Sequence, residues 1–108
     1  MWIFLPGGFL SIVADNARPS GDQLLVRSRK RSHIARHFPH AEIIEGGGTD
    51  YGFRSWVPRD QVKALMADQV DGLNYGNFKN AISDHGYHDA ALDTWMVMRR
   101  YQDSPSAP

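Results

Sequence analysis

The sequence contains no cysteine. Disulfide bonds, thiol nucleophiles, thiolate zinc sites and iron–sulfur clusters are therefore excluded. Long apolar runs are also lacking, and none approaches the roughly 20 residues that a membrane-spanning helix needs. The apolar run at residues 1–5 has no positive charge before it and ends at Pro6, unlike a signal peptide. These absences predict a cytoplasmic protein without a membrane partner.

An excess of charge of either sign is missing as well. Twelve basic and twelve acidic residues give a formal net charge of zero over 108 residues. Charged residues make up 22% of the chain and hydrophobic residues 42%, which is typical of a folded globular protein rather than a disordered one. This length and composition predict a single α+β domain over residues 1–103, followed by a flexible tail at 104–108.

Runs of strand-forming residues separated by turn residues predict four strands, at 9–14, 23–28, 41–45 and 51–57. In the last of these, Tyr51, Phe53 and Ser55 alternate with Arg54 and Trp56, which places the two sets on opposite faces. The apolar run at residues 2–4 is left open as a further short strand.

Four helices are predicted from apolar spacing and from end signals. The first covers residues 29–38 and ends before Pro39. The second begins at Pro58 and ends at Gly72. A third is expected between Asn74 and Gly86, and a last one runs to about residue 101, with Trp95 packed between it and the sheet.

This order of elements predicts a four-stranded antiparallel sheet covered on one face by helices, with a helical C-terminal third. Residues 23–72 follow a strand-helix-strand-strand-helix order. If the strand at 9–14 takes the place of a final strand, the fold is a ferredoxin-like sandwich with permuted ends.

No residue pattern indicates a catalytic or cofactor site. His33 and His37 are one helical turn apart, but no Glu follows His33, as the metalloprotease pattern requires. The acidic and imidazole residues at 84–89 fit a junction between two helices. The glycines at 46–48 lack the helix that follows a phosphate-binding loop and fit a hairpin turn. We therefore predict no enzyme activity, no cofactor and no metal.

Positive charge is concentrated in residues 23–41, which contain no acidic residue. This segment could contact an acidic protein surface or phosphates, or it could be a solvated face whose cations pair with acidic residues elsewhere. We interpret it as a partner-binding site made of Arg27, Arg29, Lys30, Arg31 and Arg36. The aromatic residues Tyr51, Phe53 and Trp56 are a second candidate contact, for a protein or for bases.

Several different short motifs are spread along nearly the whole chain. They are Met1-Trp2-Ile3-Phe4, Phe9-x-Ser11-Ile12-Val13, Val26-Arg27-Ser28-Arg29, Asp50-Tyr51-Gly52-Phe53-Arg54, Asn74-Tyr75-Gly76-Asn77-Phe78-Lys79, Tyr87-His88-Asp89, Trp95-Met96-Val97-Met98 and Arg100-Tyr101-Gln102. This combination resembles a family of short, functionally uncharacterised bacterial and phage proteins. The resemblance brings no established catalytic residues, and Asn74 stands where it leads us to expect Asp.

Small size and the absence of an active-site pattern fit a non-enzymatic protein that binds another macromolecule. We expect that partner to be a protein or a protein complex. The phage-associated form of such a protein would be an inhibitor of a bacterial defence complex, similar to an anti-CRISPR protein. The alternative is a nucleic-acid-binding module that uses the basic segment 27–37. The oligomeric state stays open.

Overall fold

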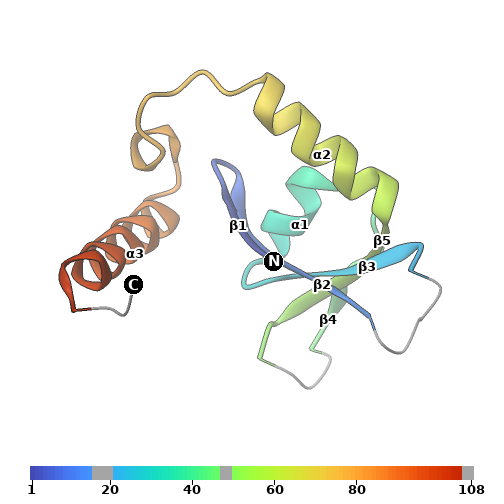
Figure 1. Ribbon diagram of the computed structural model, residues 1–108. Helices are drawn as coiled ribbons and strands as arrows, with labels where there is room; N and C mark the ends of the chain where they lie inside the picture. Colours follow the sequence, from blue (N-terminus) through green and yellow to red (C-terminus); the bar gives the residue numbers. More distant parts are fainter. Residues whose placement is uncertain (16–20, 47–49, 106–108) are drawn as a thin grey trace. The chain divides into compact units, whose positions relative to one another are not determined.

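The computed structural model describes residues 1–15, 21–46 and 50–105. The described elements, drawn in Figure 1, are β1 (Trp2–Leu5), β2 (Gly8–Ala14), β3 (Gln23–Ser28), α1 (Arg31–His37), β4 (Ile44–Glu45), β5 (Phe53–Pro58), α2 (Arg59–Asp71), the 3₁₀ turn η1 (Lys79–Ala81) and α3 (His85–Asp103). The chain forms two units, Met1–Asn74 and Tyr75–Pro108. A single domain over residues 1–103 therefore stays a prediction. Most of the glycine turn at 46–48 and of the tail at 104–108 lies outside the described residues.

An antiparallel sheet with the strand order β1-β2-β3-β5-β4 forms the first unit. The predicted α+β class and the antiparallel sheet are confirmed, but the predicted number of four strands is wrong. Residues 2–5 form a fifth strand because Pro6 and Gly7 make a short turn, and Leu5 then lies opposite Gly8. The predicted strand at 41–45 is reduced to Ile44–Glu45.

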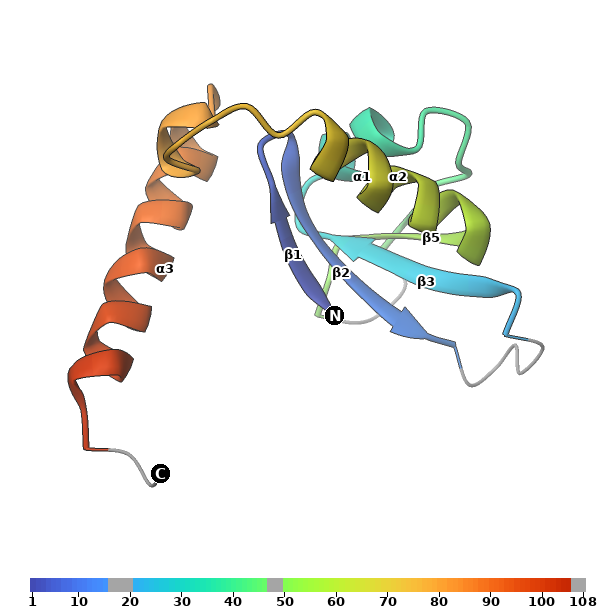
Figure 2. The ribbon, with the colours of Figure 1, turned by 45° about the horizontal axis from the view of Figure 1, so that its top comes forward.

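Helices α1 and α2 lie on the same side of the sheet in both views (Figures 1 and 2). Side chains alternate along each strand, so only every second residue faces these helices. The helix-facing strand residues and the apolar residues of the helices form one core cluster. Its buried members are Leu5, Leu10, Ile12, Val26, Ile34, Phe38, Val57 and Val62.

The ends of these two helices agree with the predictions to within two residues. Pro58 precedes α2 as its N-cap, and Asp60 lies in the first turn, where a negative charge suits the helix dipole. At the other end, the Gly72 N–H donates to the carbonyl of Asp68. Local sequence signals therefore determine where α2 begins and ends.

The second unit differs from the prediction. Between Asn74 and Gly86 the structure has only the three-residue turn η1 rather than a helix. The Asn77 side chain accepts a hydrogen bond from the Asn80 N–H (3.3 Å) at the start of this turn. The Asp84 carboxylate caps α3 by accepting from the Tyr87 N–H (2.8 Å). Gly86 consequently lies in the first turn of α3 and does not end a helix.

The predicted burial of Trp95 is also wrong, because this side chain is 50% exposed. The Lys79 ammonium lies 5.2 Å from the centre of its ring, within the same unit. The residues of α3 that are buried are Ala91 and Tyr87, one and two turns nearer its start than Trp95. The apolar spacing of Leu92, Trp95, Met96 and Met98, from which this helix was predicted, does not coincide with its buried residues.

Gly8 lies where the hairpin of β1 and β2 packs against helix α1. Its φ is +156°, and a Cβ atom on it would lie 2.5 Å from the His33 Cγ. The imidazole of His33 is buried there, and its Nδ1 accepts a hydrogen bond from the Phe9 N–H (3.2 Å). Because no side chain fits between them, glycine at position 8 is required for α1 to lie against the hairpin.

We predict that Gly8→Ala lowers the free energy of unfolding by about 1–3 kcal/mol, since the added methyl group overlaps the His33 ring. The matched control is Gly52→Ala, whose methyl group meets no heavy atom within 4 Å and which should be nearly neutral. Urea denaturation of both variants measures the difference. Equal stabilities of the two variants would contradict this packing.

Candidate functional site

The side of the sheet opposite α1 and α2 carries a second set of side chains. Register places Ser11, Arg27 and Arg54 beside one another across β2, β3 and β5. Among the described residues of Met1–Asn74, no helix lies on this side. We call it the open face, and its residues are Trp2, Phe4, Phe9, Ser11, Val13, Gln23, Leu25, Arg27, Ile44, Arg54, Trp56 and Pro58.

On the open face, the side chains that β1 and β2 contribute include three aromatic residues. The ring centres of Phe4 and Phe9 are 4.6 Å apart, and Trp2 meets Phe9 edge-on at 6.1 Å. Trp2 is 72% exposed. Such a large exposed aromatic side chain on a strand is a typical anchor for a binding partner.

Two arginines meet one aromatic ring at the end of β3. The guanidinium carbon of Arg27 lies 4.7 Å from the centre of the Tyr51 ring, and that of Arg29 lies 4.0 Å from it. Arg27 also donates to the Ser11 hydroxyl oxygen (2.7 Å). Tyr51 is buried, so its ring packs against the two guanidinium groups and presents little surface of its own.

An ion pair adjoins this cluster. Arg29 donates through both terminal nitrogens to the Asp50 carboxylate (2.9 and 3.2 Å) and also to the Asp50 carbonyl oxygen (2.8 Å). The hydrogen bond and the positive charge of Arg29 lower the pKa of Asp50 below its ordinary value. Asp50 therefore stays ionised and offsets the charge of Arg29 at this edge of the sheet.

The five predicted basic residues do not share one surface. Arg27 and Arg29 meet at Tyr51, but Arg36 lies on α1 in the helical layer and donates to the Gly7 carbonyl oxygen (3.1 Å). Lys30 and Arg31 are exposed at the start of α1. The chain reverses direction between β3 and α1, which separates these charges although they are adjacent in sequence.

The predicted aromatic contacts are separated in the same way. Tyr51 is covered by the arginines, and Phe53 packs against the core beneath the helices. Only Trp56 lies on the open face, where its indole N–H donates to the Asp15 carboxylate. Arg54 lies outside the basic segment and was not predicted as a site residue. The alternation of residues 51–57 nevertheless placed Arg54 on the same face as Trp56.

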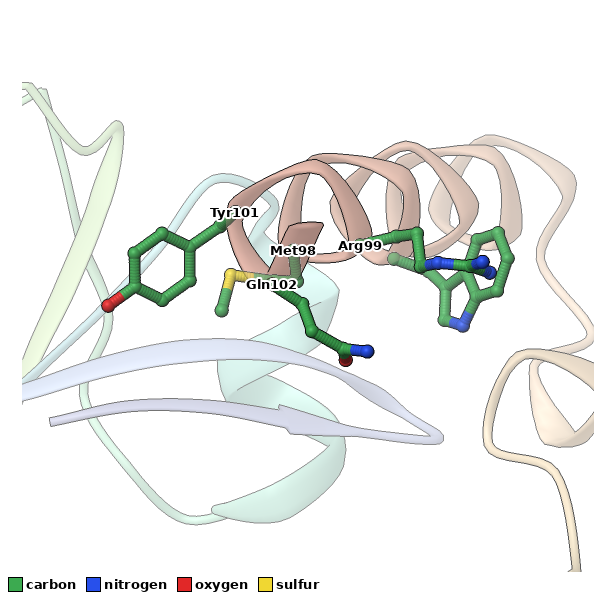
Figure 3. A pocket seen from close by; sticks show the side chains of 5 residues that line it. Met98, Arg99, Tyr101 and Gln102 are labelled. Carbon is green, nitrogen blue, oxygen red and sulfur yellow. The ribbon is translucent and has the colours of Figure 1, made fainter. Parts of the chain in front are cut away.

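The described surface includes the following two pockets. One, of about 290 Å³, lies between the end of α1 and α2 and is lined by residues that include His37, His40 and Asp68. The other, of about 440 Å³, follows one side of α3 beside Trp95 and Tyr101 (Figure 3).

Among the described residues, no group of three histidine or acidic side chains is arranged to hold a metal ion. None of the described helices is long and apolar enough to cross a membrane. The predictions of no metal, no cofactor and no enzyme activity stay predictions.

Comparison of the chain with protein-family models, with curated proteins and with solved structures finds no match. The resemblance to bacterial and phage proteins therefore stays a prediction from the motifs.

The lowered pKa of Asp50 leads to a measurable prediction. A carbon-detected NMR titration should give a midpoint for its carboxyl group below the ordinary value of 3.8, and Arg29→Gln should move the midpoint back toward that value. The stabilisation from this pair is present above the ordinary pKa and is lost as the pH falls through the lowered one. Arg31→Gln, which leaves the pair in place, is the control. The same midpoint in the wild type and Arg29→Gln would contradict the pairing.

Proposed function

We propose that this is a small non-enzymatic protein that binds another protein through the open face of its sheet. The observation that carries the proposal is the composition of that face: four aromatic side chains, two arginines and three aliphatic residues, beside Ser11, Gln23 and Pro58. Aromatic residues and arginine are enriched in protein interfaces, whereas lysine and glutamate, which this face lacks, are depleted there.

Charge on this face supports an acidic partner. Arg27 and Arg54 lie opposite each other in the β3–β5 register, at the middle of the sheet. Their positive charge is flanked by Phe9 and Trp56, whose burial under a partner would exclude water and strengthen pairing with carboxylates. Acidic residues on the partner would then fix its orientation on an apolar surface.

The resemblance to phage and bacterial proteins extends this proposal to a biological role. In that role the protein would be a phage-derived inhibitor that covers a surface of a bacterial defence complex, as an anti-CRISPR protein does. We also infer that β2, β3, β4 and β5 with α1 and α2 form a ferredoxin-like sandwich with permuted ends. The position of β2 beside β3, in the place of a final strand, supports this relation.

A nucleic acid is the second candidate partner. Trp2, exposed on the sheet, offers a surface on which a base could stack, and Arg27 and Arg29 could approach phosphates. The basic segment 27–37 would then supply the charge. Pairing of Arg29 with Asp50 weakens this second candidate, because it neutralises one of the cations.

We predict that Arg54→Glu abolishes partner binding, since it reverses the charge at the middle of the open face. Arg31→Glu is the matched control, because it makes the same change of net charge at an exposed site at the start of α1. The measurement is affinity capture from nuclease-treated lysate of the bacterial host, followed by direct binding to the purified partner. Wild type and Arg31→Glu should retain the partner with similar affinity.

Retention by Arg54→Glu at wild-type affinity, with its fold intact, would contradict the use of the open face. Loss of the captured material on nuclease treatment would favour the second candidate. Fluorescence anisotropy with a labelled single-stranded oligonucleotide then tests that candidate directly, because binding to phosphates weakens steeply with salt.

A further inference from the structure

The outer edge of β1 carries backbone groups that no other strand of the first unit uses. The Met1 nitrogen donates to the Ile12 oxygen (2.6 Å), and the Ile12 nitrogen donates to the Met1 oxygen (2.8 Å). In an antiparallel pair such hydrogen-bonded positions alternate, so Ile3 and Leu5 also point toward β2. The N–H and C=O groups of Trp2 and Phe4 therefore point away from the sheet. Within the described part of Met1–Asn74 they have no partner.

Within the described part of Met1–Asn74, the residues of this edge lack the sequence devices that usually prevent strand pairing. Monomeric proteins protect an edge strand with lysine, proline, an inward-pointing charge or a bulge. Residues Trp2–Leu5 are all apolar, and each is paired with β2 without interruption. The opposite edge of the sheet, β4, has only two residues and includes Glu45. A partner strand is therefore expected at β1 and not at β4.

We propose that β1 pairs antiparallel with β1 of a second copy of this chain. The two outward-pointing residues lie symmetrically on either side of Ile3, which places a two-fold axis at that residue. Trp2 then lies opposite Phe4 of the second copy, and Phe4 lies opposite its Trp2. Both are hydrogen-bonded pairs in which each residue donates one N–H and accepts at one C=O. The edge is thus complementary to itself in this one register.

Side chains support the same pairing. Trp2 and Phe4 lie on the open face, so each aromatic ring would meet a ring of the second copy across the junction. Ile3 would face Ile3 of the second copy at the position where opposing side chains approach most closely, and no charged side chain of β1 would be repelled. The axis is perpendicular to the sheet, so the open faces of both copies lie on the same side. The dimer would present one continuous open face.

Sedimentation equilibrium across a concentration series tests this proposal, with Trp2→Pro as the variant and Trp2→Ala as its control. Both remove the exposed indole, but only proline removes the outward-pointing N–H, whose loss leaves the pairing of β1 with β2 intact. The wild type should form dimers. The dissociation constant of Trp2→Pro should exceed that of Trp2→Ala by about tenfold or more, because symmetry removes the bond twice.

A monomeric wild type at every concentration would overturn the proposal, as would equal dissociation constants for the two variants. Circular dichroism serves as the control that both variants keep the fold. A measurement without substitution protects against misfolding of Trp2→Pro: isotope-filtered NOEs in a mixture of labelled and unlabelled wild type. Cross-peaks between the Ile3 side chains of two copies are expected. A dimer without them would place the interface elsewhere and overturn the proposal.

Discussion

Antiparallel pairing among β2, β3 and β5 is the constraint on which the rest of the structure depends. It assigns Val26 to the helical side and Arg27 to the other side, and a shift of one residue would exchange them. The requirement to bury Val26, together with Val57, fixes that register. The apolar core therefore also determines where Arg27 and Arg54 lie, although neither arginine contributes to the core cluster.

Much of the first unit could be predicted from the sequence because its signals are local. Alternation along residues 51–57 and the proline and glycine at the ends of α2 correctly indicated a strand and a helix. The run Trp2–Leu5 carried no such alternation, so its pairing with β2 depended on a contact that only the folded chain shows. In the second unit, capping by Asp84 starts α3 at His85, so Gly86 lies in its first turn and does not end a preceding helix.

The candidate site could be predicted only in part, because adjacency in sequence is not adjacency in space. Five basic residues close together in the chain are distributed over a strand, a turn and a helix. Arg54, which lies 27 positions from Arg27, becomes its direct neighbour through the β3–β5 pairing. Tyr51 looked like a contact residue, but it is buried beneath two guanidinium groups. The Tyr51 ring packs against the guanidinium groups of Arg27 and Arg29.

The central claim is that the open face meets the partner, and site-specific photo-crosslinking tests it most directly. A benzophenone side chain in place of Val13 lies on the open face, whereas one in place of Lys63 lies on the exposed side of α2. Irradiation in lysate of the host should link the first variant to one partner protein and leave the second without that product. Crosslinking of the same partner only from position 63 would contradict the account.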